Sequence, residues 1–436
     1  MNRAILIVAG VLIFLLLVAA GWSVRQANLN EKARVAAELR MVAMRDFLAL
    51  NLPGLKQSVE YLPGSGKARM ALLDASRLYL AELVKEGVGD ARSRLQLAAV
   101  YQQTADLEAS LAASDLDNYK KSAENYGKAI ELRQQVKDTR EAAREALIDL
   151  YTRRAMILQL FGKFDDAKKA LEPAFGLFQD EGASRSMKQK AARMFSTRAY
   201  IALHETGAPG AEGALRKALM LLGEDNEPQS RYEIARATRL LAMLLAFEKR
   251  SGEARDHGSR SVSTGERLLA EFPARDDYRR GLAASYVVQA GLLPAVEARP
   301  MFAKALEACS FVVAADPYDV QAGSELIAIA TRMAAADDAA AVEALTRARE
   351  LIAPLLKNFP NSYTAATDQI NLALQTARYL KGKGRQRDAL DTLKRVLPLA
   401  SEQAAEFPKL DFVRGRLEAV QQEMSELTGA VARGAN

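Results

Sequence analysis

The side chains that carry out most enzyme chemistry are scarce in this sequence. It contains one cysteine, Cys309, and two histidines, His204 and His257. A nucleophile with its base, or a soft-metal site, needs several such residues, and Cys309 lies in the apolar stretch LEACSFVV, which is typical of a buried thiol. We therefore expect no catalytic residue, no metal site and no cofactor, and we predict that the chain is not an enzyme.

Two short stretches imitate motifs of nucleotide chemistry. MRDFLALN spaces Arg45, Asp46 and Asn51 as in a kinase catalytic loop, but the sequence has no glycine-rich loop with its strand lysine and no Asp-Phe-Gly. GSGK at Gly64–Lys67 lacks the earlier glycine of a phosphate-binding loop and the Ser or Thr after its lysine. We interpret the first as part of a helix and the second as a loop that precedes one.

Arginine recurs at a regular interval in the middle of the chain. Arg193, Arg236 and Arg280 follow one another by 43 and 44 residues, and Arg239 comes one helical turn after Arg236. If they line one face, that face favours an acidic protein or peptide partner, although arginines also lie along solvated helix faces. Three residues that share this inferred face predict either an apolar contact strip or core packing: Met156, Tyr200 and Met243.

A longer repeat sets the positions of these residues. Pro273, Pro317, Pro360 and Pro408 are separated by 44, 43 and 48 residues, and a small–large–small triplet recurs with nearly the same period. Residues spaced by four and three share one helical face, and alanines there let two helices approach closely. The clearest triplets are Ala167, Leu171 and Ala174; Ala211, Leu215 and Ala218; Ala298, Phe302 and Ala305; and Ala389 with Leu393.

Composition and period together predict an all-α fold of stacked helix hairpins. Ala, Leu, Glu, Arg and Lys dominate the 436 residues, and 60 basic and 54 acidic residues leave a mixed net charge of +6, which argues against a nucleic-acid-binding surface. One hairpin cannot bury its apolar face alone, so consecutive hairpins must stack. We expect this array over residues 61–428, with a C-terminal capping helix and a disordered tail at 429–436.

The turn at Gly162 followed by Ala167, Leu171 and Ala174 resembles the tetratricopeptide repeat. The resemblance implies an α-solenoid whose first helices line a concave face that takes up peptides or partner helices. The period of 43–44 residues exceeds the usual 34. A longer second helix that Pro273, the proline of a Glu-Phe-Pro sequence, stops would explain the difference.

The N-terminus contains an uncharged run from Ala4 to Val24, long enough to span a bilayer core. We predict a signal-anchor over residues 1–24, with a cleaved signal peptide after Val18-Ala19-Ala20 as the alternative. An amphipathic juxtamembrane helix is expected at 25–60, where a short heptad-like seam suggests homodimerisation. Basic residues after Val24 favour a cytoplasmic repeat region.

Residues 22–136 show a narrower resemblance, through stretches such as RQANLNEKARVAAELRMVAMRDFLA and YLPGSGKARMALLDASRLYLAELV. They resemble the membrane-anchored repeat region of bacterial transmembrane serine/threonine protein kinases, without the kinase domain. In that family the repeats lie outside the cytoplasm. On this basis we expect a single-pass protein of the bacterial inner membrane with a periplasmic repeat region.

These observations predict a membrane-anchored, non-catalytic scaffold that binds a protein or peptide partner and no nucleic acid. The alternative is an extracytoplasmic sensor module for a serine/threonine-kinase-type signalling system, with the kinase on another chain.

Overall fold

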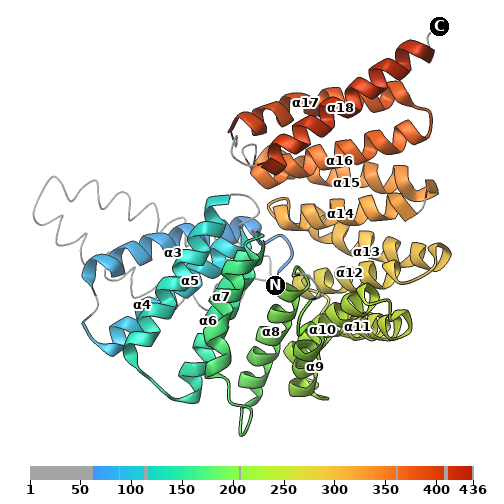
Figure 1. Ribbon diagram of the computed structural model, residues 1–436. Helices are drawn as coiled ribbons and strands as arrows, with labels where there is room; N and C mark the ends of the chain where they lie inside the picture. Colours follow the sequence, from blue (N-terminus) through green and yellow to red (C-terminus); the bar gives the residue numbers. More distant parts are fainter. Residues whose placement is uncertain are drawn as a thin grey trace, which may run out of the picture. The chain divides into compact units, whose positions relative to one another are not determined.

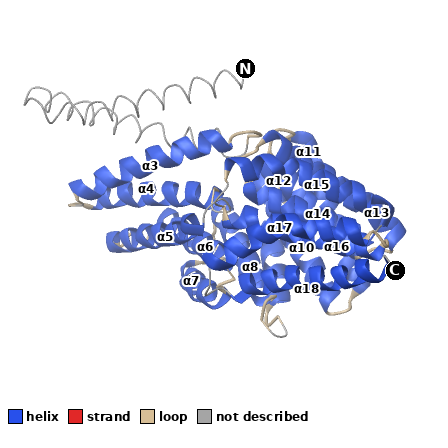
Figure 2. Cartoon of the chain, turned by 90° about the horizontal axis from the view of Figure 1, so that it is seen from above, coloured by secondary structure: helices blue, strands red, loops and turns tan. Residues whose placement is uncertain are grey.

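The computed structural model describes residues 62–87, 89–111, 116–160, 162–205, 208–336, 338–359, 362–406 and 411–434. Every regular element in these ranges is an α-helix, so the all-α prediction is confirmed (Figures 1 and 2). The chain divides into two compact units, the first ending at Tyr278 and the second beginning at Arg279. Each unit is described by itself.

The first unit is built from helix hairpins. Its helices are α3 (Gly66–Glu86), α4 (Ala91–Ser110), α5 (Leu116–Val136), α6 (Glu141–Leu160), α7 (Phe164–Leu177), α8 (Arg185–Ala202), α9 (Ala211–Leu222), α10 (Pro228–Phe247) and α11 (Ser251–Glu271). The hairpins α6–α7, α8–α9 and α10–α11 follow one another, and their first helices α6, α8 and α10 pack side by side (Figure 1).

The second unit continues the same pattern. α12 (Asp276–Gly291) contains the boundary between the units, and α13 (Ala295–Ala315), α14 (Val320–Ala336), α15 (Asp338–Asn358), α16 (Tyr363–Gly382), α17 (Gln386–Glu406) and α18 (Asp411–Gly434) follow it. α14 packs against α15 and α16 against α17, while the first helices α14 and α16 also contact each other. The predicted array of stacked hairpins is therefore present in both units.

The small–large–small triplets lie on the faces where helices meet. Leu171 is fully buried between Ala167 and Ala174 on α7, within a cluster that also contains Ile148 and Tyr151 of α6. The alanines add almost no bulk, so the leucine can fill the space between the helices. The other triplet residues are buried in the same way: Ala211, Leu215, Ala218, Ala298, Phe302, Ala305, Ala389 and Leu393.

Local sequence signals set the helix boundaries. α11 ends at Glu271 and α13 at Ala315, each two residues before a repeating proline, which cannot continue a helix. Gly162, in the turn between α6 and α7, has a φ of 71°, a conformation that glycine adopts without steric cost. Ser184 starts α8 by accepting a hydrogen bond from the Met187 backbone N–H at 3.1 Å.

The C-terminal helix is longer than we expected. α18 begins at Asp411, close to the predicted capping helix, but it continues to Gly434 through most of the segment that we had predicted as a disordered tail. The residues of that segment up to Gly434 include no proline and are mainly small or helix-favouring, so nothing in them stops the helix.

No helix in the described part of the chain is long and apolar enough to cross a membrane. This finding contradicts the predicted single-pass membrane localisation. The segment 1–24, on which that prediction was based, and the juxtamembrane helix with its seam at 25–60 lie outside the described residues.

Candidate functional site

The regularly spaced arginines lie on successive first helices, and each contacts a carboxylate of this chain. Arg193 on α8 places its guanidinium 2.7 Å from the Glu233 carboxylate on α10, and Arg236 lies 3.6 Å from the other oxygen of the same group. The Glu233 side chain is only 1% exposed. In the second unit, Arg280 pairs with Glu325 at 2.6 Å and Asp319 at 3.5 Å. Arg239, one turn beyond Arg236, is partly buried.

Toward the N-terminus, the equivalent positions on the preceding helices are occupied by acidic residues. Asp106 on α4 and Asp149 on α6 precede Arg193 by steps of 43 and 44 residues. Arg153 bridges the two carboxylates, at 3.1 Å from Asp106 and 2.8 Å from Asp149, and Arg193 reaches Asp149 at 3.9 Å. We call this set the first-helix ladder: Asp106, Asp149, Arg153, Arg193, Glu233 and Arg236.

The electrostatics of the ladder agree with a set of mutually stabilised ion pairs. The charges of Asp106 and Asp149 raise the pKa of Arg153 well above its usual value. Burial alone would raise the pKa of Asp149, but the nearby charges of Arg153 and Arg193 hold it below its usual value. The ion pairs of the ladder connect α4, α6, α8 and α10. Its arginines therefore already have carboxylate partners within this chain.

In the second unit, the two residues that follow the ion-paired Arg280 at the same interval form a protonatable contact. Ser324 on α14 follows Arg280 by 44 residues, and Asp368 on α16 follows Ser324 by another 44. The Ser324 hydroxyl donates a hydrogen bond to the Asp368 carboxylate. Burial raises the pKa of Asp368 to about 6, against the hydrogen bond from Ser324 and the charge of Arg416, which both lower it.

Asp368→Asn should change how stability depends on pH. A carboxyl whose pKa is higher in the folded than in the unfolded state favours folding while protonated, and this contribution is lost as pH rises toward and through the folded value. Between pH 5 and pH 8 the wild type should lose about 1 kcal/mol more free energy of unfolding than the variant. Urea denaturation at both pH values measures this, with Asp391→Asn as an exposed control; an equal change in wild type and Asp368→Asn would contradict it.

Beyond the ladder, the C-terminal ends of α6 and α10 expose apolar side chains. Leu160 on α6 is 53% exposed, and Met243 and Phe247 on α10 are 40% and 73% exposed. His204 lies two residues after the end of α8 and 44 residues after Leu160; it is exposed and stacks on Phe164 with ring centroids 4.0 Å apart. We call this set the first-helix strip: Met156, Leu160, Tyr200, His204, Met243 and Phe247.

The strip combines residues that we predicted with residues that we did not. Met156, Tyr200 and Met243 were expected on this face, and Tyr200 lies beside His204 with ring centroids 5.2 Å apart. Leu160, His204 and Phe247 were missed, although they repeat the same steps of 44 and 43 residues one helical turn further on. Their spacing was the signal that could have identified them.

Comparisons with known proteins add little. No family model and no curated protein matches the chain. The resemblance of residues 22–136 to kinase repeat regions therefore stays a prediction.

Several solved structures align with the chain at low scores. A Rap protein complexed with competence and sporulation factor aligns at 13% identity and a TM-score of 0.44, covering 88% of this chain and 99% of its own. A human IFIT1 dimer with PPP-AAAA aligns at 13% identity and 0.40, covering 92% and 87%. The C-terminal part of a TPR repeat-containing protein from Cytophaga hutchinsonii aligns at 17% and 0.20, covering 56% and 94%. Similarity at this level supports no inference about function.

Proposed function

We propose that this chain is a non-catalytic scaffold that binds a protein partner through the first-helix strip. The observation that carries the proposal is the set of exposed apolar side chains at the C-terminal ends of α6 and α10, where Leu160, Met243 and Phe247 are between 40% and 73% exposed, with Tyr200 and His204 at the equivalent positions in between. Contiguous exposed apolar residues on a folded protein commonly mark a binding surface. The ladder is the less suitable binding surface, because its arginines already contact carboxylates of the chain. This favours the first-helix strip over the arginines as the surface that binds the partner.

The spacing of the strip suggests the form of the partner. Packed helices lie roughly 8–10 Å apart, and this sets the distance between equivalent residues on α6, α8 and α10. Residues seven apart on one face of a helix are separated by about 10.5 Å along its axis. An amphipathic helix with apolar residues at that interval would therefore contact Leu160, His204 and Phe247 in turn.

A peptide-display selection tests this function. The full chain is used to select binders from a library of 16-residue helix-favouring peptides, and the affinities of the selected peptides are then compared between variants. Phe247→Ser should weaken binding by about 2 kcal/mol, or roughly 30-fold, because a large aromatic side chain that becomes buried in an interface is a common hot spot.

The matched control is Met220→Ser on α9, which removes an apolar side chain that is 62% exposed but lies outside the strip. It should leave the affinity unchanged. Selected peptides that bind Phe247→Ser as tightly as the wild type would contradict the proposal, as would a selection that enriches no apolar residue at an interval of seven.

A further inference from the structure

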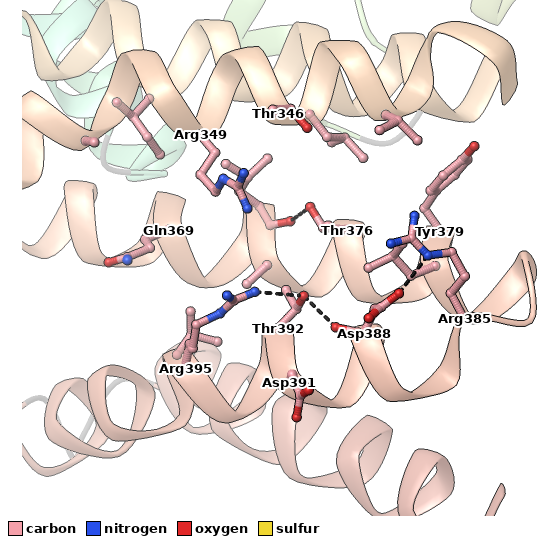
Figure 3. A pocket seen from close by; sticks show the side chains of 18 residues that line it. Thr346, Arg349, Gln369, Thr376, Tyr379, Arg385, Asp388, Asp391, Thr392 and Arg395 are labelled. Carbon is pink, nitrogen blue, oxygen red and sulfur yellow. Dashed lines mark hydrogen bonds and ion pairs between the residues drawn. The ribbon is translucent and has the colours of Figure 1, made fainter. Parts of the chain in front are cut away.

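The second unit contains a pocket that the first-helix strip does not include. It has a volume of about 620 Å³ and lies between α15, α16 and α17 (Figure 3). Its apolar lining comes from buried side chains of all three helices, including Leu345, Ile352, Leu372 and Val396. Cavities of this size, apolar with a few polar groups, are typical of ligand sites.

Two guanidinium groups enter the pocket from opposite walls. Figure 3 shows the Arg349 side chain extending from α15 and the Arg395 side chain extending from α17, both toward α16, which lies between the two helices. Arg395 donates one hydrogen bond to the Thr392 hydroxyl at 3.3 Å. Neither arginine forms an ion pair with a carboxylate within the described ranges of the chain.

The carboxylates of the pocket are already paired with other residues. Asp388 accepts a hydrogen bond from Arg385 at 2.7 Å, and Asp391 lies 3.6 Å from the Lys394 ammonium. The lining therefore retains uncompensated positive charge at Arg349 and Arg395. Guanidinium groups bind carboxylates through paired, charge-assisted hydrogen bonds, so an acidic group is the complementary ligand.

The dimensions of the pocket favour an extended segment. Its lining residues on α16 run from Gln369 to Leu380, which is about 16 Å along the helix. At about 3.3 Å per residue, this length accommodates roughly five residues of extended chain. We propose that the pocket binds an acidic peptide segment of a partner protein. One carboxylate of the peptide would lie between Arg349 and Arg395, and its apolar side chains would pack against Leu345 and Leu372.

Fluorescence anisotropy with a labelled Glu-Leu-Glu-Leu-Glu peptide and the full chain tests this site. Arg349→Glu and Arg395→Glu should each weaken binding at least about tenfold, since each removes a charge-assisted contact. Replacing the three glutamates by glutamine should have a similar effect. Arg347→Glu is the matched control, because Arg347 is exposed on the same helix but does not line the pocket.

The milder variant Arg349→Gln, with thermal unfolding measured for every variant, separates lost binding from lost folding. Four results would overturn the proposal: no binding by the wild type, equal binding of the glutamine peptide, binding unaffected by both pocket variants, or equally effective competition by acetyl-glutamate, which would indicate a small acid as the ligand. Phe247→Ser should bind this peptide normally, so failure at the pocket and failure at the first-helix strip are distinguishable.

Discussion

Replacing Arg193 by alanine is expected to lower the free energy of unfolding by about 3 kcal/mol. The guanidinium of Arg193 lies 2.7 Å from the Glu233 carboxylate, whose side chain is 1% exposed. Its removal leaves that charge buried, with Arg236 at 3.6 Å and the Gln229 amide at 3.2 Å as incomplete compensation. Urea denaturation of the purified variant measures the loss.

The controls separate a buried pair from an exposed one. Arg216→Ala breaks a contact of 2.6 Å with Glu212 in which the arginine side chain is 51% exposed, and it should cost less than about 1 kcal/mol. Arg193→Met combined with Glu233→Leu should recover most of the loss, because two apolar residues leave no unpaired charge. A cost below about 1 kcal/mol for Arg193→Ala would show that the ladder does not hold the helices together.

Replacing Leu171 by alanine is expected to lower the free energy of unfolding by about 2–5 kcal/mol. Leu171 is fully buried between Ala167 and Ala174, and the alanines are too short to fill the space that the substitution leaves. The loss therefore combines the transfer of the side chain with the free energy of a cavity. Thermal and urea denaturation both report it.

Leu160→Ala provides the comparison for the same chemical change at an exposed position, since Leu160 is 53% exposed. Its cost should stay within about 0.5 kcal/mol. Similar costs for the two variants would mean that the triplets do not form the contact between helices that we describe.

The hairpins could be predicted from the sequence because their signals are local. Pro273 and Pro317 cannot continue a helix, and each follows a helix end by two residues. The spacing of Ala167, Leu171 and Ala174 places them on one face whatever the neighbouring helices do. The end of α18 was not predictable in this way, because no strong stop signal follows Leu427 and the helix continues to Gly434.

The electrostatic partners could not be predicted, because they depend on how neighbouring helices are aligned. Arg193 was recognised by its spacing, but its partner Glu233 lies three residues before Arg236 on the next first helix, and only the packing of α8 against α10 brings the charges together. The pocket has the same origin. Arg349 and Arg395 are 46 residues apart, and only the positions of α15 and α17 on either side of α16 direct both toward one space.

Site-specific photocrosslinking tests the central claim most directly, that the first-helix strip binds a partner protein. A photoreactive residue is placed at Phe247 in the full chain, expressed in its source cells, and for comparison at Val296, which is 87% exposed on α13 outside the strip. We predict a discrete crosslinked product at position 247 that disappears when Leu160 and Met243 are replaced by serine, and no such product at position 296. Equal crosslinking at both positions, or none at position 247, would contradict the claim.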